Sequence, residues 1–241
     1  MIVDIFIPCF IDQLYPDTAL NMVKILEKYG IGVNYNPEQT CCGQIAFKSG
    51  FWNEARSIAI KFLKDFSNDR YIVSPSPSCV GMIKNYYNEF FYNSAFHNDY
   101  KQVQKNIYEF TDFMVNILKV GDNTGAIFNE TVTYHDSCSS LREINTSEQA
   151  RELLKHVKGL KLVEMEESDV CCGFGYTFSV KNEAISTAMA QQKIQNAINT
   201  GASYIVSSES SCLMHLDAYI EKHKLPIKTI HIVDVLASGW E

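Results

Sequence analysis

The sequence predicts an α/β fold made of two pseudo-symmetric βαβ repeats, each with a parallel, Rossmann-like sheet whose carboxyl edge carries cysteines. Three observations predict it. The chain has two similarly spaced sets of cysteines, both halves show the same order of short apolar and longer amphipathic stretches, and 241 residues suit one large or two small domains. Strands that alternate with helices of about ten or more residues form βαβ units with parallel strands.

The cysteine positions define the repeats. The first set is Cys9, Cys41, Cys42 and Cys79. The second set follows at offsets of 129, 130, 130 and 133 residues and is Cys138, Cys171, Cys172 and Cys212. The string YIVS also recurs, at 71–74 and 204–207. We therefore predict a first repeat over 1–122 and a second over 123–241, joined by a polar, glycine-containing linker at 119–130.

Each repeat is expected to contain the same elements in the same order. A strand runs into the first cysteine, a helix with a glycine cap leads to a weaker second strand, and the paired cysteines precede one long helix. A third strand leads into a serine-rich turn with the last cysteine, and a fourth strand and helix complete the repeat. In the first repeat these elements are expected at 2–7, 17–30, 32–35, up to 66, 71–73 and 107–118. In the second repeat they are expected at 131–134, 147–159, 160–165, up to 198, 204–206 and 227–236.

Composition and charge exclude several classes of protein. The formal net charge is −7 and no run of Lys or Arg is long enough to follow a phosphate backbone, so no nucleic acid partner is expected. The first residues, MIVDIFIPCF, have no basic segment before their apolar stretch, and no apolar run approaches the roughly 18 residues of a membrane helix. We expect neither an export signal nor a membrane span, and a cytoplasmic, reducing location.

The cysteines are expected to converge on metal or cluster sites. All eight follow a strand or lie in the turn before a helix, and such positions meet at the carboxyl edge of a parallel sheet. Adjacent cysteines, as in Cys41-Cys42 and Cys171-Cys172, have Cα atoms about 3.8 Å apart, too close for a usual disulfide. They also suit a single tetrahedral zinc poorly, whereas a multi-iron cluster offers each sulfur its own metal.

Iron–sulfur binding is therefore the preferred interpretation of the cysteines. A four-cysteine zinc site in at least one repeat is the main alternative, because zinc accepts four thiolates from varied spacings. Buried cysteines without a function and structural disulfides are less favoured, since neither explains the duplicated spacing.

The arrangement of the cysteines resembles that of the cysteine-rich CCG family. In both halves one cysteine is followed after 32 or 33 positions by Cys-Cys-Gly, and the last cysteine comes 37 or 40 positions later. The strings TCCGQIAFKSG, VSPSPSCVGM, YHDSC and CCGFGYTFSVK carry the likeness, which runs the length of the chain. The family includes the cysteine-rich component of heterodisulfide reductase, and the chain specifically resembles its lactate utilisation members.

The resemblance implies an iron–sulfur electron-transfer subunit of a complex that oxidises L-lactate to pyruvate. It implies one cluster in each repeat and, as partners, a ferredoxin-like iron–sulfur subunit and a further lactate utilisation subunit. Many relatives have a fifth thiol three residues after the last cysteine, where this chain has Met82 and His215, so four ligands and a 4Fe-4S cluster are expected. Two alternatives stay open: a heterodisulfide or quinone reductase type of catalytic subunit, and a zinc-stabilised scaffold without a redox role.

Several other side chains stand near the cysteines. His135, three residues before Cys138, is a candidate proton donor or metal ligand, or a histidine that bonds the backbone at the end of a strand. His215 replaces the fifth thiol of many relatives. Four aromatic residues are expected to pack around the clusters and exclude water, namely Trp52, Phe174, Tyr176 and Phe178.

Overall fold

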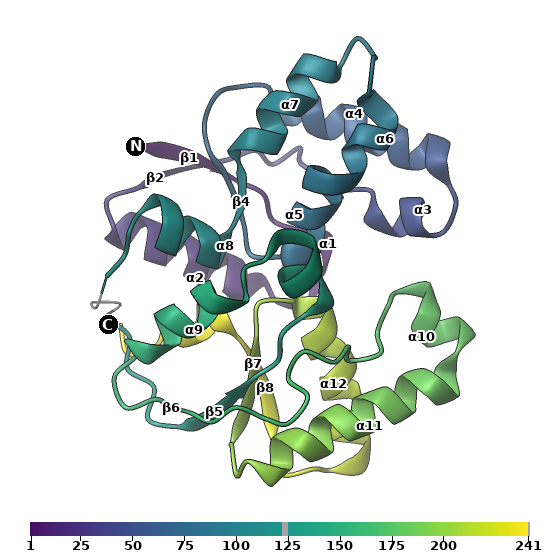
Figure 1. Cartoon of the computed structure of the whole chain (residues 1–241). Helices are drawn as coiled ribbons and strands as arrows, with labels where there is room; N and C mark the ends of the chain where they lie inside the picture. Colours follow the sequence, from purple (N-terminus) through teal and green to yellow (C-terminus); the bar gives the residue numbers. More distant parts are fainter. Residues whose placement is uncertain (122–124, 241) are drawn as a thin grey trace.

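Each half of the chain contains one four-stranded sheet, and both sheets are entirely parallel (Figure 1). The computed structural model describes residues 1–121 and 125–240. The first sheet has the order β2-β1-β3-β4, with β1 at Ile2–Ile5, β2 at Gly32–Tyr35, β3 at Ile72–Ser74 and β4 at Ile107–Glu109. The second has the order β6-β5-β7-β8, with β5 at Thr131–Tyr134, β6 at Lys161–Leu162, β7 at Tyr204–Ser207 and β8 at Lys228–His231. The predicted pair of Rossmann-like repeats is confirmed.

Helices connect the strands in both repeats. Those of the first repeat are α1 (Cys9–Leu14), α2 (Pro16–Lys28), α3 (Gln44–Lys48), α4 (Trp52–Asp65), α5 (Pro77–Gly81), the π-helical turn η1 (Met82–Tyr86), α6 (Tyr87–Phe91), α7 (His97–Asn106), α8 (Phe110–Asp112) and the π-helical turn η2 (Phe113–Ile117). Those of the second are the π-helical turn η3 (Ser140–Ile144), α9 (Ser147–Lys155), α10 (Thr177–Lys181), α11 (Glu183–Asn199), α12 (Ser210–His223) and α13 (Ile232–Leu236). Parallel neighbours require such crossovers.

The structure corrects three details of the expected elements. The long helix after the paired cysteines is two helices in each repeat, broken in the first repeat near Gly50, whose φ is +86°. Helix α2 begins at Pro16 rather than Asp17, because proline suits the first turn of a helix. Gly30 follows the end of α2 as expected, with φ at +72°, whereas α9 ends at Lys155 and Gly159 lies beyond its cap.

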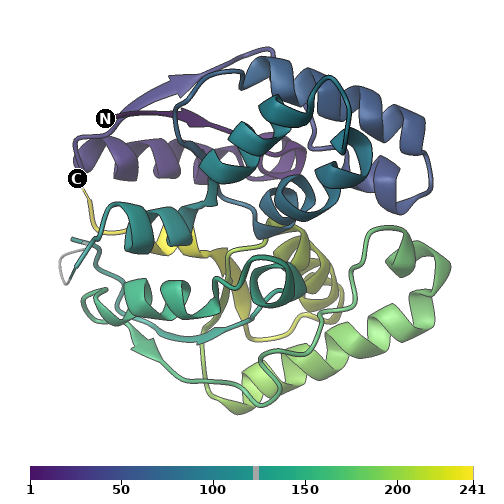
Figure 2. The same cartoon turned by 45° about the horizontal axis from the view of Figure 1, so that its top comes forward.

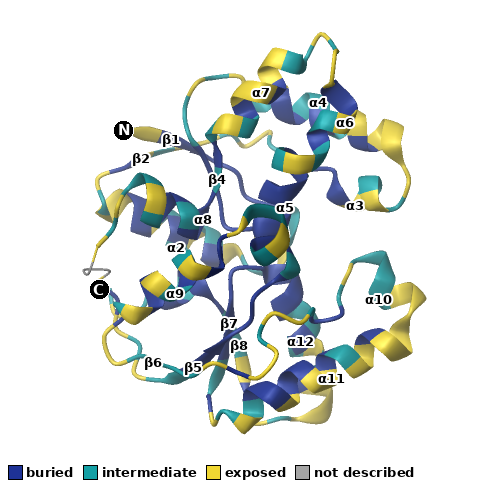
Figure 3. Cartoon of the chain, in the orientation of Figure 1, coloured by how far each residue is buried: buried dark blue, intermediate teal, exposed yellow. Residues whose placement is uncertain are grey.

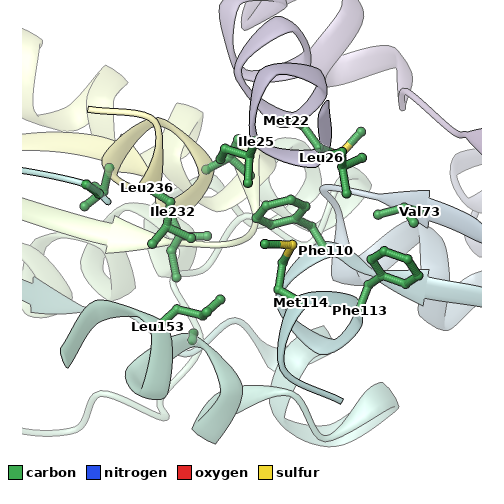
Figure 4. Close-up of a cluster of buried hydrophobic side chains, with 14 of the residues drawn as sticks. Met22, Ile25, Leu26, Val73, Phe110, Phe113, Met114, Leu153, Ile232 and Leu236 are labelled. Atoms are coloured by element: carbon green, nitrogen blue, oxygen red, sulfur yellow. The ribbon is translucent and has the colours of Figure 1, made fainter. Parts of the chain in front are cut away.

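One hydrophobic core joins the two repeats. Helix α2 packs on α13 and α8 packs on α9, so each contact pairs a helix of one repeat with a helix of the other (Figure 2). In Figure 4, Phe110 and Met114 of the first repeat lie among Leu153, Ile232 and Leu236 of the second. The predicted boundary between 122 and 123 falls in the segment 122–124, outside the described residues, and it stays a prediction.

A partly buried carboxylate adds polar contacts to this interface. Asp234, in α13, accepts hydrogen bonds from Thr18 Oγ1 at 2.7 Å and from Asn21 Nδ2 at 2.9 Å, both from α2. These bonds satisfy polar groups at the edge of the shared core. Within the described residues, no helix combines the length and the apolar character that crossing a membrane requires.

The shared core predicts that one substitution weakens both repeats together. Phe110 is fully buried in it, so Phe110→Ala should lower the free energy of unfolding by about 3–5 kcal/mol. Urea denaturation followed by circular dichroism should show one cooperative transition at a lower midpoint. Ile185→Ala, on the exposed face of α11, is the control and should change the free energy by no more than about 0.5 kcal/mol. Two separate transitions, with only one of them shifted, would contradict a shared core.

Glu109 lies buried at the carboxyl end of β4, as the N-cap of α8. Its Oε2 accepts hydrogen bonds from Thr111 N at 2.9 Å and from Asp112 N at 3.3 Å. Burial disfavours the charged carboxylate more strongly than these bonds favour it, and it raises the pKa of Glu109 to about 8. The folded state therefore binds this proton more tightly than the unfolded chain does, where the pKa is about 4.3.

This raised pKa predicts a pH dependence of stability. The stability that Glu109 contributes is fully present below about pH 4.3 and is lost as the pH rises through about 8. Between these two pH values the folded state still holds the proton while the unfolded chain has released it, so rising pH favours unfolding. Glu109→Gln mimics the protonated form, so its free energy of unfolding should increase relative to the wild type between pH 5 and pH 8. Urea denaturation at both pH values measures this difference, with exposed Glu148→Gln as the control. A constant difference between Glu109→Gln and wild type would rule out the raised pKa.

Candidate cluster sites

The first four cysteines gather at the carboxyl edge of the first sheet. Cys9 begins α1 after β1, Cys79 lies in α5 after β3, and Cys41 and Cys42 directly precede Gly43 and α3. The Cys42 and Cys79 sulfurs lie 3.3 Å apart, and the Cys41 thiol hydrogen-bonds those of Cys9 and Cys42. We call these four residues the first quartet.

The second quartet, Cys138, Cys171, Cys172 and Cys212, repeats this arrangement. The Cys171 thiol interacts with those of Cys138 and Cys172, and the Cys172 thiol interacts with that of Cys212. All eight cysteines are free thiols. The structure therefore brings together every cysteine that the sequence analysis selected, four in each repeat.

A glycine with a positive φ follows each cysteine pair. Gly43 has φ at +82° and Gly173 at +95°, values that residues other than glycine rarely adopt. Their N–H groups donate to the sulfurs of Cys41, at 3.3 Å, and Cys171, at 3.4 Å. The CCG motif thus turns the backbone so that an amide faces a cysteine sulfur.

The crowded thiols of each quartet cannot all ionise by themselves. Hydrogen bonds with Cys42 and Cys9 lower the pKa of Cys41 to about 3, whereas the hydrogen bond to Cys41, together with burial, raises the pKa of Cys9. In the second quartet the hydrogen bond to Cys171 and burial raise the pKa of Cys138. Four thiolates in such a space need a multivalent cation to balance their charge, which a metal or an iron–sulfur core supplies.

Each quartet lines a cavity. The cavity beside the first quartet has an empty volume of about 300 Å³ and that beside the second about 340 Å³, both including their openings. All four sulfur-bearing residues of each quartet line the corresponding cavity. Figure 3 shows that α5 and the first turn of α12, which carry the last cysteine of each quartet, are buried where the repeats meet. The donor set of four thiols fits a thiolate-bound metal or cluster.

Three residues line both cavities, so the two sites share a wall: Ser78, Tyr176 and Glu209. Glu209 is buried and caps α12, and its carboxylate accepts hydrogen bonds from Ser78 N at 2.9 Å and Ser211 Oγ at 2.8 Å. The Tyr176 hydroxyl lies 3.2 Å from Ser78 Oγ and donates to Gln44 Oε1. Tyr176 adopts a φ of +52°, a strained value for a residue with a side chain.

The other side chains selected from the sequence divide into those that reach the sites and those that do not. Phe174 and Tyr176 line the second cavity, as expected, but Trp52 is 58% exposed and stacks on Phe47 instead. Among the described residues, Phe178 lines neither cavity. The expectations for Trp52 and Phe178 are wrong. Trp52 begins α4 just after the break near Gly50 and lies on the surface, and Phe178 lies in α10, before the break at Asn182. His215 lies 3.2 Å from Ser186 Oγ and does not line the second cavity either.

His135 is completely buried at the end of β5. Its ring nitrogens, with the sulfurs of Cys172 and Cys212, form a group in which one ligand atom from each residue lies within 4.8 Å of the others. Neither ring nitrogen makes a hydrogen bond of normal geometry within the described structure, although the backbone of Ser168 lies nearby. Burial and the charge of Lys193 lower the pKa of His135 to about 3, so its ring is neutral.

The sequence analysis missed Glu209, Ser78 and Lys193. For Glu209 and Lys193 the signal lay in positions where the two repeats differ, whereas Ser78 has the serine Ser211 as its counterpart and carried no such signal. Ser76 and Glu209 stand at equivalent places, three residues before the last cysteine of each quartet, and only the second is acidic. A carboxylate in an otherwise duplicated serine-rich turn marks a residue with a role between the sites.

Comparisons with known proteins agree with this site. The family model described as "Cysteine-rich domain", named CCG, matches residues 3–84 and 132–217, which include both quartets. A curated protein named lactate utilization protein A from Oceanobacillus iheyensis is 38% identical over 100% of this chain and 98% of its own length. Proteins of the same name from Halalkalibacterium halodurans and Geobacillus thermodenitrificans are 36% and 37% identical, each over 98% of this chain and over 96% and 98% of their own lengths.

One solved structure shares the fold. A hypothetical protein from Helicobacter pylori superposes with a TM-score of 0.63 at 13% sequence identity. The match covers 100% of this chain and 49% of that one, so this chain spans about half of it. At this identity the likeness concerns the arrangement of strands and helices alone.

The glycine of each CCG motif allows a paired test of the local geometry. A Cβ at Gly173 would lie 2.7 Å from Ser186 O, whereas one at Gly43 would lie 3.3 Å from the equivalent Ala55 O. Gly173→Ala should therefore cost about 1–3 kcal/mol of stability, more than Gly43→Ala, because it adds a backbone clash to the strain of a positive φ. Urea denaturation of the two variants measures this, with Gly50→Ala, which has a positive φ but open space, as the control for strain alone. Equal losses at all three positions would contradict the close approach at Gly173.

Proposed function

Because the chain belongs to the cysteine-rich CCG domain family, we propose that it is an iron–sulfur subunit that passes electrons within a complex oxidising L-lactate to pyruvate. Each repeat, 1–122 and 123–241, holds one 4Fe-4S cluster. The ligands are Cys9, Cys41, Cys42 and Cys79 in the first repeat and Cys138, Cys171, Cys172 and Cys212 in the second. The observation that carries the proposal is the gathering of four free thiols beside a cavity, twice in one chain.

Four thiols at each site suit four-ligand clusters. The relatives' fifth thiol is absent here, and the residue in its place, His215, is engaged with Ser186 instead of facing the cavity. A thiolate-bound cluster accepts and releases single electrons. The chain's own cysteines hold it in place, and the N–H groups of Gly43 and Gly173 donate to its thiolates.

Aromatic residues of both repeats cover the space between the two sites. The Phe10 ring, from α1, packs edge-on against Phe174 with centroids 5.9 Å apart and against Tyr176 at 6.2 Å. These rings restrict the access of solvent to the two sites, beside the polar wall that Ser78 and Glu209 contribute. Since the two cavities have a wall in common, an electron reaching one site is adjacent to the other.

The lactate substrate and the partners rest on the names of the relatives. An electron-transfer subunit is neither the site of lactate oxidation nor the terminal electron acceptor. It therefore needs one partner that donates electrons to it and another that accepts electrons from it. We propose a ferredoxin-like iron–sulfur protein and a further lactate utilisation subunit in these roles. The relatives carrying the name lactate utilization protein A match nearly the full length of this chain, which supports the assignment to that process.

Anaerobic purification of the full chain tests the proposal. We expect about four iron atoms and four sulfides at each site, with visible absorption that dithionite bleaches. Zinc without acid-labile sulfide would contradict it and favour the zinc-stabilised scaffold. Turnover of a dithiol substrate by the isolated chain would favour the reductase alternative.

Single substitutions locate the clusters. Cys42→Ser and Cys172→Ser should each remove one cluster and so about half of the iron and sulfide, because a serine hydroxyl is a poor ligand for iron–sulfur centres. Each variant leaves the other quartet intact, so the two variants are matched controls for each other. Exposed Ser57→Ala, on α4, is the neutral control. Full iron content in either cysteine variant would contradict the assigned ligands.

A further inference from the structure

The two sites differ in the residues behind their thiols. The backbone pairing sets the equivalence, since Phe6 N donates to Val73 O at 3.0 Å in the first repeat and His135 N donates to Val206 O at 2.8 Å in the second. Phe6 and His135 therefore occupy the same position, one residue beyond the end of strand pairing. The phenyl ring of Phe6 in the first repeat is thus replaced by the imidazole ring of His135 in the second.

A second exchange lies beside the first. A Cβ on Gly43 would face Ala55 O and Ile58 of α4, and one on Gly173 would face Ser186 O and Met189 of α11. This places the two helices in register with an offset of 131 residues, so that Phe62 corresponds to Lys193. The offset of 129 suggested by the recurring string Asn-Glu-Ala, at 53–55 and 182–184, does not hold in the structure.

The exchanged residues form a pair in each repeat. The rings of Phe6 and Phe62 pack edge to face with centroids 4.9 Å apart, in the same hydrophobic cluster as Cys42 and Cys79. In the second repeat the charge of Lys193 acts directly on His135. The first quartet therefore has an apolar pair behind it, and the second has a polar one.

His135 lies behind the sulfurs rather than in front of them. Its ring is near the sulfurs of Cys172 and Cys212, yet among the described residues it does not line the cavity that these cysteines face. Ser168 O, the nearby backbone acceptor, already accepts hydrogen bonds from Lys193 Nζ and Asp136 N, both at 3.2 Å. Since a carbonyl oxygen has two lone pairs, the ring N–H is left for a thiolate, which is the stronger acceptor.

Lys193 adds a positive charge on the same side. Its side chain is buried, and its ammonium group donates to the carbonyl oxygens of Glu167 and Ser168. Among the acidic groups that raise the pKa of Lys193, Cys172 has the largest effect. A cation and an N–H donor close to a cluster both favour the reduced form, because reduction adds one negative charge.

We propose that His135, donating its one ring N–H to the Cys172 or Cys212 thiolate, and Lys193 give the second site the higher reduction potential of the two. This inference rests on the proposed function. A higher potential at the second site would favour the transfer of one electron from the first site to the second, with no proton or further reagent needed. His135 is a positioning residue that acts through the thiolates.

The test is an anaerobic redox titration of the full chain, followed by electron paramagnetic resonance. Cys42→Ser retains only the second cluster and Cys172→Ser only the first, so these backgrounds assign the two midpoint potentials. In the Cys42→Ser background, His135→Phe should lower the ratio of reduced to oxidised cluster at a fixed potential about tenfold, which is about 59 mV for one electron. The iron and sulfide content should not change.

Three further variants separate hydrogen bonding from general damage. His135→Gln keeps an N–H donor and should retain most of the wild-type potential. The reciprocal change Phe6→His, in the Cys172→Ser background, should raise the potential of the first cluster. His215→Phe removes a histidine of the same repeat that does not adjoin the thiols and should leave both potentials unchanged.

Several outcomes would overturn the inference. Unchanged potentials in His135→Phe would exclude the hydrogen bond, and loss of iron from the second site in both His135 variants would make His135 a ligand instead. A first cluster with the higher potential would reverse the direction of transfer. If the wild-type chain holds no iron and sulfide, the proposed function itself fails, and that result is obtained before any potential is measured.

Discussion

The mutual crowding of four thiols is the constraint on which the rest of the structure depends. Thiol groups this close compete for hydrogen bonds, and burial opposes their ionisation, so Cys41 is favoured as a thiolate at the expense of Cys9. A core of iron or another metal relieves this conflict by balancing all four charges together. The parallel sheet makes the crowding achievable, because the carboxyl ends of β1 and β3 direct Cys9 and Cys79 toward one edge.

The duplicated fold brings the two quartets side by side. The repeats meet in pseudo-symmetric contacts, with α5 against η3 and α12 against α1, and the larger helices interlock around the shared core. The elements that carry the cysteines therefore lie at the interface between the repeats. Glu209 connects them through its hydrogen bond to the N–H of Ser78, so the wall between the sites is polar and fixed in position.

The symmetry is broken in the residues that lie behind the two quartets. The CCG turns, the cysteine positions and the strand orders repeat, but Phe6 and Phe62 are exchanged for His135 and Lys193. Duplication followed by change in the residues behind the ligands is a simple way to obtain two centres with one ligand set and different environments. Hydrogen bonding and charge around the sulfurs are recognised determinants of cluster potential.

Sequence alone determined the fold class, the two repeats and the eight cysteines, because these depend on local periodicity and on spacing, which survive without three-dimensional coordinates. It failed at Trp52, which an interrupted helix leaves on the surface. Only the tertiary structure decided that Glu209 lies between the sites and that Lys193 and His135 share a position behind the second quartet. These residues are far apart along the chain, and their proximity follows from packing, which no local pattern encodes.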